Sequence, residues 1–298
     1  MAQKEKHLAA LNSFAKRIKK DSKVIALLLY GSLAYGTVWE KSDLDMELIV
    51  RDGSISKSRL LWFEEEGVFA HLDINEVSKF KKYLQRVRGG FDHAIYGRGE
   101  LVFSKDEALR ELFEEARRIG EDDAPKAFAS KVDGLVNWMN KAEKHITMLN
   151  EPLYAQRFLQ LCAPIVAEME MLRHKENPNR ESILRARQLN PELMHEVFVV
   201  PSTTVMSKAD IERTIKILDD YLMQHVSWWS RYLIRFLGDG EIKTFSHIHD
   251  QCASVEALEY LYHKGMVMRT TRPLGLFKNS SLTIDEVAYL YIKEEKPL

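Results

Sequence analysis

An uninterrupted apolar run that ends at a glycine is the feature that most constrains the fold. Val24–Tyr30 is apolar throughout, and Gly31 and Ser32 follow it directly. A run of this length is typical of a strand buried on both faces, and a glycine at its end marks a turn. Such a strand needs packing on both sides. The sequence therefore predicts an α/β unit in which the chain turns at Gly31 and a helix begins.

Two later stretches alternate between apolar and polar residues, as strands with one buried face do. In Asp43–Val50, one face carries Leu44, Met46 and Leu48, and the other carries Asp43, Asp45 and Glu47. In Val68–Val77, one face carries Ala70, Leu72 and Ile74, and the other carries His71, Asp73 and Asn75. We therefore expect two strands that each present acidic side chains on one face.

The acidic faces predict a metal site. Asp43 and Asp45 are two residues apart, so on a strand they share a face with Cα atoms roughly 6 to 7 Å apart. Asp73 completes the cluster if the two strands are neighbours. Carboxylates that converge in this way bind one or two Mg²⁺ ions, which neutralise the charge that develops on phosphoryl oxygens. Glu47 is expected to be a solvated strand residue, and His71 either a packing residue or one that supports a metal ligand from behind.

The turn at Gly31 and Ser32 predicts a phosphate contact. A glycine lets the backbone approach a ligand closely, and the backbone amides and the Ser32 hydroxyl are hydrogen-bond donors for phosphate oxygens. We expect Gly31 and Ser32 to bind the phosphates of a nucleotide.

Leu29–Thr37, Ser42–Asp45 and His71–Ile74 together resemble the DNA polymerase β-like nucleotidyltransferase superfamily. The resemblance covers about the first 105 residues and includes Ala94–Phe103, which resembles the strand-turn region that closes the minimal core. It implies that Gly31 and Ser32 contact the triphosphate, that Asp43 and Asp45 ligate the metal and that Asp73 is the third carboxylate.

Three parts are expected along the chain: a mixed-sheet α/β nucleotidyltransferase core with flanking helices at 1–123, an α-helical bundle at 124–238 and a small winged-helix-like module at 239–298. This layout resembles a group of uncharacterised bacterial nucleotidyltransferase-like proteins. The bundle is loosely similar to that of the aminoglycoside nucleotidyltransferases, which take a base from their helical domain. Glu143, four residues after Met139 on the apolar stripe, is the candidate for that base.

The C-terminal module is predicted to contain a helix at Val255–His263, two strands around Arg272–Pro273, namely Met266–Thr271 and Leu274–Phe277, and a closing helix at Asp285–Ile292. Between residues 239 and 298 there are seven lysines and arginines against nine aspartates and glutamates. Nucleic-acid-binding modules usually carry a positive excess, so an interaction or dimerisation role is at least as well supported as DNA binding.

The whole chain has a formal charge of −1, with 43 basic and 44 acidic residues, so charge gives it no general attraction to nucleic acid or anionic lipid. No apolar run reaches the 18 to 20 residues, roughly, that a membrane span needs, and the two cysteines are not in C-x-x-C spacing. We expect a cytoplasmic protein without a membrane partner.

The leading functional hypothesis is an Mg²⁺-dependent nucleotidyltransferase. It would move a nucleoside monophosphate from a nucleoside triphosphate, with ATP as the expected donor, to a hydroxyl of an unidentified small-molecule or protein acceptor. The alternative is a non-catalytic nucleotide-binding regulator whose C-terminal module contacts DNA or a protein partner. The three retained carboxylates favour the first hypothesis.

Overall fold

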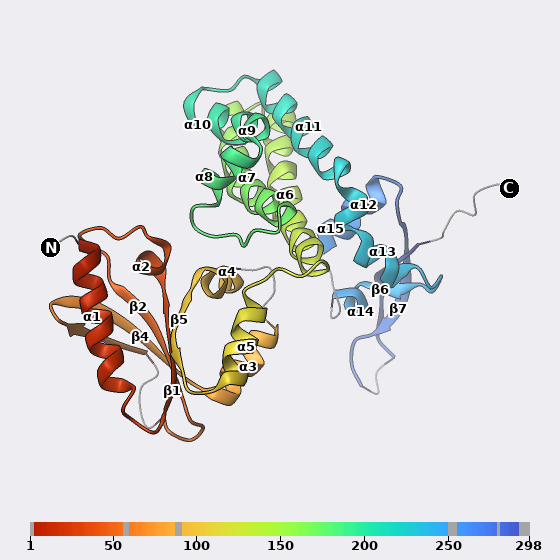
Figure 1. Cartoon of the computed structure of the whole chain (residues 1–298). Coiled ribbons are helices and arrows are strands. Elements are labelled where there is room, and N and C mark those ends of the chain that lie inside the picture. Colours follow the sequence, from red (N-terminus) through yellow and green to blue (C-terminus); the bar gives the residue numbers. More distant parts are fainter. Residues whose placement is uncertain (1–2, 56–59, 87–90, 250–254, 279–280, 292–298) are drawn as a thin grey trace. The chain divides into compact units, whose positions relative to one another are not determined.

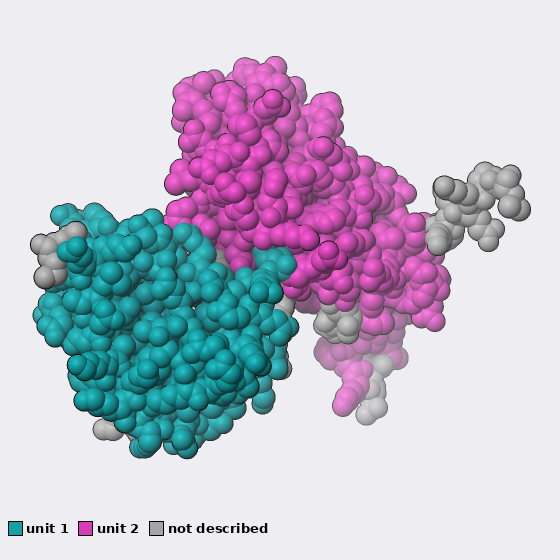
Figure 2. Space-filling view, viewed as in Figure 1, with its two compact units in different colours: residues 1–119 teal, residues 120–298 magenta. Residues whose placement is uncertain are grey.

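The chain forms two compact units, residues 1–119 and 120–298 (Figures 1 and 2). This computed structural model describes residues 3–55, 60–86, 91–249, 255–278 and 281–291. The first unit ends close to where the sequence predicts the end of the core. The predicted boundary between residues 238 and 239 falls inside the second unit. Over the described residues, no helix combines the length and the apolar character needed to cross a lipid bilayer.

The first unit contains a five-stranded sheet in the order β3-β4-β2-β1-β5. β1 pairs antiparallel with β2 and with β5, β2 pairs parallel with β4, and β3 is an antiparallel edge strand beside β4. The expected mixed sheet is therefore present. Its strands are β1 (Val24–Tyr30), β2 (Leu44–Val50), β3 (Leu60–Glu65), β4 (Val68–Glu76) and β5 (Glu100–Ser104).

Helices cover both faces of this sheet, with α1 on one face and α3 and α5 on the other (Figure 1). The first face carries Leu44, Met46 and Leu48 of β2 with Ala70 and Leu72 of β4, as the alternation predicts. The second face carries Ile49 against α3 and α5. The helices are α1 (Gln3–Ile18), α2 (Gly31–Tyr35), α3 (Val77–Arg86), α4 (Phe91–Arg98) and α5 (Glu107–Ala116).

The second unit is mainly helical, and its two longest helices, α6 and α7, pack along each other. Pro164 lies inside α7, as expected from the sequence. The helices are α6 (Asp123–Met148), α7 (Pro152–Arg173), α8 (Ser182–Leu189), α9 (Pro191–Met194), the π-helix η1 (His195–Val199), α10 (Val200–Thr203), α11 (Lys208–Gln224), α12 (Val226–Trp229) and α13 (Arg231–Leu237).

The C-terminal segment of this unit contains helices followed by two long strands. The elements are β6 (Lys243–Thr244), α14 (Phe245–His249), α15 (Val255–His263), β7 (Met268–Gly275) and β8 (Thr283–Leu290), and the strands form a sheet in the order β6-β8-β7. The expected helix at 255–263 is present. The winged-helix-like assignment of this segment stays a prediction.

Two sequence-based expectations for this segment are wrong. Asp285–Ile292 was expected to be helical, but residues 283–290 form β8, the central strand of the sheet, because pairing on both sides outweighs a short apolar pattern that fits either structure. The two short strands expected around Pro273 are one continuous strand, β7. Proline is tolerated there because β7 is an edge strand, where no ladder bond from residue 273 is needed.

Candidate functional site

The turn after β1 and the first acidic strand meet at Gly31. This residue has a φ of +72°, in the left-handed region, and a Cβ atom added to it would lie 2.0 Å from Oδ2 of Asp45. The Asp45 carboxylate therefore packs directly on the Gly31 backbone. Tyr30 and Asp45 are opposite each other in the β1–β2 register, which places the turn beside the carboxylate. Only glycine satisfies both the backbone angle and this contact.

Asp73 lies on the same face of the sheet as Asp45. β2 and β4 are parallel neighbours in which Asp45 is opposite His71 and Glu47 is opposite Asp73. The His71 ring lies between the two aspartates: Nδ1 is 3.5 Å from Oδ1 of Asp45, and Nε2 is 4.0 Å from Oδ2 of Asp73. The sequence predicted that Asp73 could join the cluster if its strand lay next to that of Asp45, and the two strands are neighbours.

Tyr30 closes this group from the neighbouring strand. Its hydroxyl donates to Oδ2 of Asp73 at 3.3 Å. Burial, reinforced by the negative charge of Asp73, raises the pKa of the Tyr30 hydroxyl far above its ordinary value. Tyr30 therefore remains a protonated donor to Asp73. The side chains of Asp45 and Asp73 are 25% and 40% exposed, so both carboxylates are accessible from solvent.

These acids are the oxygen donors that Mg²⁺ prefers, and their partial exposure leaves room for a cation and its waters. Asp43 immediately precedes β2, and the buried hydroxyl oxygen of Ser32 has no hydrogen-bond partner among the described residues. Within those same residues, no three His, Cys, Asp or Glu side chains lie close enough together to share a metal ion. The donor types therefore fit Mg²⁺, and metal ligation by Asp43, Asp45 and Asp73 stays a prediction.

Glu47 corrects one expectation, because it is not a solvated strand residue but is only 4% exposed. Its carboxylate accepts hydrogen bonds from Nδ2 of Asn75 at 2.8 Å and from the hydroxyl of Tyr96 at 3.0 Å. Burial raises the pKa of Glu47 to about 7, and the two hydrogen bonds act in the opposite direction. The acidic face of β2 thus runs from a buried end at Glu47 to an open end at Asp45.

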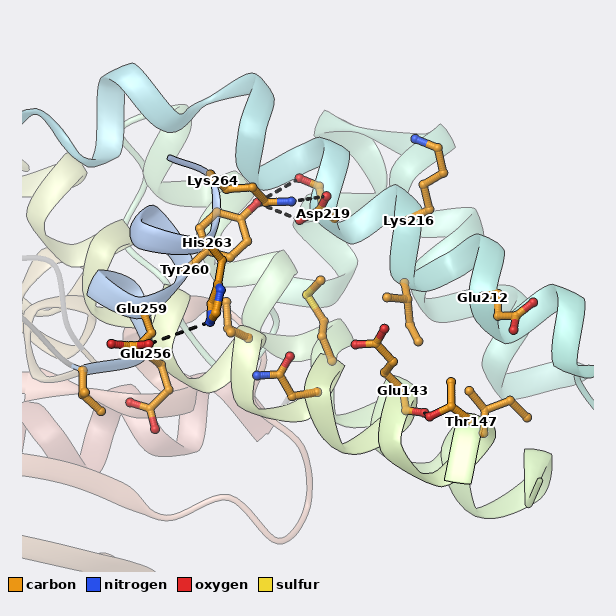
Figure 3. A pocket seen from close by; sticks show the side chains of 16 residues that line it. Glu143, Thr147, Glu212, Lys216, Asp219, Glu256, Glu259, Tyr260, His263 and Lys264 are labelled. Atoms are coloured by element: carbon orange, nitrogen blue, oxygen red, sulfur yellow. Dashed lines mark hydrogen bonds and ion pairs between the residues drawn. The ribbon is translucent and has the colours of Figure 1, made fainter. Parts of the chain in front are cut away.

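Glu143 belongs to the second unit, in α6. It is exposed and lines a pocket of about 690 Å³ whose walls come from α6, α11 and α15 (Figure 3). Its backbone carbonyl accepts a hydrogen bond from the Thr147 hydroxyl at 2.7 Å. Lys264 in the same pocket is held by Asp219 at 2.8 Å. The assignment of Glu143 as a base stays a prediction.

Three residues around the acids escaped sequence analysis: Tyr30, Tyr96 and Trp62. Tyr30 directly precedes Gly31, and a register that places it opposite Asp45 would have identified it. Tyr96 comes from a helix distant in sequence, and no local pattern connects it with Glu47. Trp62, opposite His71 on β3, stacks on the His71 ring with centroids 4.4 Å apart. Its strand was not predicted.

Comparisons with known proteins place the first unit in a family. Residues 12–108 match the family model described as "Polymerase beta, Nucleotidyltransferase". None of the curated proteins compared with the chain matches it. A solved structure of a nucleotidyltransferase-like protein from Exiguobacterium sibiricum shares the fold with a TM-score of 0.61 at 13% identity, covering 96% of this chain and 99% of that one. Residues 12–108 therefore form a nucleotidyltransferase domain of the DNA polymerase β-like superfamily.

Proposed function

We propose that the protein is an Mg²⁺-dependent nucleotidyltransferase that moves a nucleoside monophosphate from a nucleoside triphosphate, with ATP as the expected donor, to a hydroxyl group. The observation that carries the proposal is the contact between Asp45 and the Gly31 backbone. It brings a predicted phosphate-binding turn against a predicted metal ligand, and Asp73 lies on the adjoining strand of the same face. Donor phosphates bound at the turn would lie beside these carboxylates.

In this proposal, Gly31 and Ser32 hold the triphosphate, and Asp43, Asp45 and Asp73 hold the metal. Bound Mg²⁺ would neutralise the charge on the phosphoryl and leaving oxygens. The acceptor oxygen forms a bond to the α-phosphorus, the bond from that phosphorus to the bridging oxygen breaks, and pyrophosphate leaves. Tyr30 keeps the Asp73 carboxylate oriented through its hydrogen bond.

Glu143 is the proposed general base that takes the acceptor proton. A base must come within about 2.6 to 3.2 Å of the acceptor oxygen, or act through one water, in the working complex. The exposure of Glu143 is compatible with this role, because its carboxylate is accessible to a ligand. Replacement of Glu143 by glutamine should then lower turnover without lowering nucleotide affinity, and unchanged turnover would reject the assignment.

The test of transfer is pyrophosphate release from ATP in the presence of metabolite and protein extracts, with α-labelled ATP to mark the acceptor. We expect release that requires Mg²⁺ and is abolished in Asp43→Ala and Asp45→Ala. Asp21→Asn is the matched control. Asp21 lies just before the start of β1, whereas Gly31 follows its end. Transfer that persists in both alanine variants would refute the proposed site.

A second candidate is a non-catalytic nucleotide-binding regulator. This candidate predicts that the protein binds ATP, with affinity reduced by changes at Gly31, and releases no pyrophosphate with any extract. The same assay combined with a direct binding measurement therefore separates the two functions.

A further inference from the structure

Beside the acidic site, the β3 edge of the sheet carries an exposed aromatic stack. Trp62 of β3 and Phe69 of β4 are 53% and 56% exposed, and their rings stack with centroids 5.2 Å apart and an interplanar angle of 17°. A cross-strand aromatic pair stabilises a sheet by at most about 1 kcal/mol, whereas leaving two large rings more than half exposed is uncommon, since scattered single apolar residues are the usual case. The stack is therefore a candidate for binding a ligand.

The stack is continuous with the acids. The other neighbour of Trp62 is His71, at 4.4 Å between centroids and 21° between planes. His71 in turn lies 3.5 Å from Asp45 and 4.0 Å from Asp73. Leu60, 50% exposed, is opposite Asp73 in the β3–β4 register. An exposed apolar surface, formed by Leu60, Trp62 and Phe69, therefore lies directly beside the Asp73 carboxylate.

If the proposed function is correct, the order of the strands places this surface where the acceptor binds and away from the donor phosphates. From β1 to β3 the sheet presents in turn the Gly31 turn, Asp45, Asp73 and the aromatic stack. In an in-line displacement the acceptor approaches phosphorus from the side opposite to the leaving pyrophosphate. If the triphosphate tail lies at the Gly31 turn, the acceptor approaches from the side of Asp73 and Trp62.

The chemistry of the surface limits what binds there. Flat rings stack on exposed aromatic side chains with a preference that depends little on their substituents. Among the described residues of these two strands, the groups with a negative charge beside the stack are Glu64, which is exposed and opposite Phe69, and Asp73. A phosphate chain would be repelled by these acids, whereas a neutral or cationic ring would not.

We propose that Trp62, supported by Phe69 and His71, is the acceptor-recognition platform of this site, and that the acceptor is a small neutral or cationic molecule carrying a flat ring near its hydroxyl. Trp62 is a specificity residue in this proposal. It contacts the acceptor and leaves binding of the donor nucleotide to the Gly31 turn and the aspartates.

The experiment compares two probes, tyrosinamide, which has a ring and a hydroxyl, and serinamide, which has a hydroxyl alone. Their binding is measured by saturation-transfer NMR and titration, both without nucleotide and with Mg²⁺ and a non-hydrolysable ATP analogue. The variants are Trp62→Leu, which removes the ring, and Trp62→Phe, which keeps one. Leu61→Ala is the control on the same strand, because Leu61 is opposite Leu72, on the other face.

Wild type should bind tyrosinamide at least about tenfold more tightly than serinamide. This preference should disappear in Trp62→Leu and largely remain in Trp62→Phe and Leu61→Ala, with affinity for the ATP analogue unchanged in all of them. Equal binding of the two probes by wild type, or an unchanged preference in Trp62→Leu, would overturn the platform. So would a change from dimer to monomer in Trp62→Leu without any ring preference, which would make the stack a contact between two copies.

The two proposals fail in different ways. A wild-type protein that shows the ring preference but binds no ATP analogue would refute the proposed function and leave a ring-binding site of another purpose. A protein that binds the analogue and releases pyrophosphate with an extract, but shows no ring preference, would refute only the platform.

Discussion

At the scale of single residues, the candidate site depends on the absence of a side chain at Gly31, which is a glycine. Gly31 and Gly36 both have positive φ, +72° and +75°, but an added Cβ atom meets the Asp45 carboxylate at Gly31 and nothing within 4 Å at Gly36. An alanine at either position carries the left-handed backbone cost of about 1 to 2 kcal/mol. At Gly31 it must also displace Asp45.

We therefore expect Gly36→Ala to lower the free energy of unfolding by about 1 kcal/mol and to keep its affinity for Mg²⁺-ATP. Gly31→Ala should lose more stability and most of its nucleotide affinity. Urea denaturation and calorimetric titration with Mg²⁺-ATP measure the two effects. Equal stability and equal nucleotide affinity of the two variants would show that the contact between Gly31 and Asp45 does not contribute to nucleotide binding.

Glu47 predicts how stability depends on pH in the metal-free protein. Its pKa of about 7 in the folded state is above its ordinary value of 4.5, so the folded protein holds a proton that the unfolded chain has lost. The resulting stabilisation is full below about pH 4.5 and is lost as the pH rises to about 7, by roughly 3 kcal/mol.

Glutamine at position 47 stays neutral and keeps hydrogen-bonding atoms toward Asn75 and Tyr96. Glu47→Gln should therefore flatten the fall in stability between pH 5 and 7 and exceed wild type at pH 8, in urea denaturation with EDTA. Glu64→Gln, at an exposed carboxylate of β3, is the control and should follow the wild-type curve. Parallel curves for Glu47→Gln and wild type would contradict a protonated, buried Glu47.

At the scale of elements, one buried amide of α7 holds the segment that leads into α11. The Gln156 side chain is 6% exposed, donates to the carbonyls of Pro201 at 2.7 Å and Thr204 at 2.8 Å, and accepts from the Met206 amide at 3.0 Å. Gln160 donates to the same Pro201 carbonyl, at 2.8 Å.

Gln156→Ala should lower the free energy of unfolding by about 2 kcal/mol, because the buried Met206 amide would lose its acceptor, whereas the Pro201 carbonyl keeps its bond from Gln160. Gln160→Ala should cost about 1 kcal/mol or less, since the Pro201 carbonyl keeps its bond from Gln156. Urea denaturation provides both values. A larger effect of the Gln160 variant would reverse this ranking of the two amides.

At the scale of the whole molecule, each compact unit has buried core residues of its own. Leu28 in the first unit is 1% exposed and Leu218 in the second is fully buried. Because folding units with separate cores unfold separately, we expect two transitions in scanning calorimetry. Leu28→Ala should lower the midpoint of one transition and Leu218→Ala that of the other, each losing about 2 to 5 kcal/mol. A single transition shifted by both variants would show that the units unfold together.

The sequence by itself determined β1, β2 and β4 and the face on which each side chain lies. A period of two is a local property of the backbone, so Leu44, Met46 and Leu48 separate from Asp45 and Glu47 whatever surrounds them. The Gly31 turn was predictable for the same reason, since a positive φ is a property of one residue. The family resemblance came from these local patterns in combination.

Only the tertiary structure decided which strands are neighbours and which polar residues are buried. Glu47 and Asp45 share a face, yet Glu47 is buried and hydrogen-bonded to Tyr96 of α4, whereas the Asp45 side chain is partly exposed at the open end of the sheet. β8 was expected to be a helix and became a strand because β6 and β7 pair with it. Burial and strand pairing depend on segments distant in sequence, and the free energy of those contacts outweighs the weak local preference of a short segment.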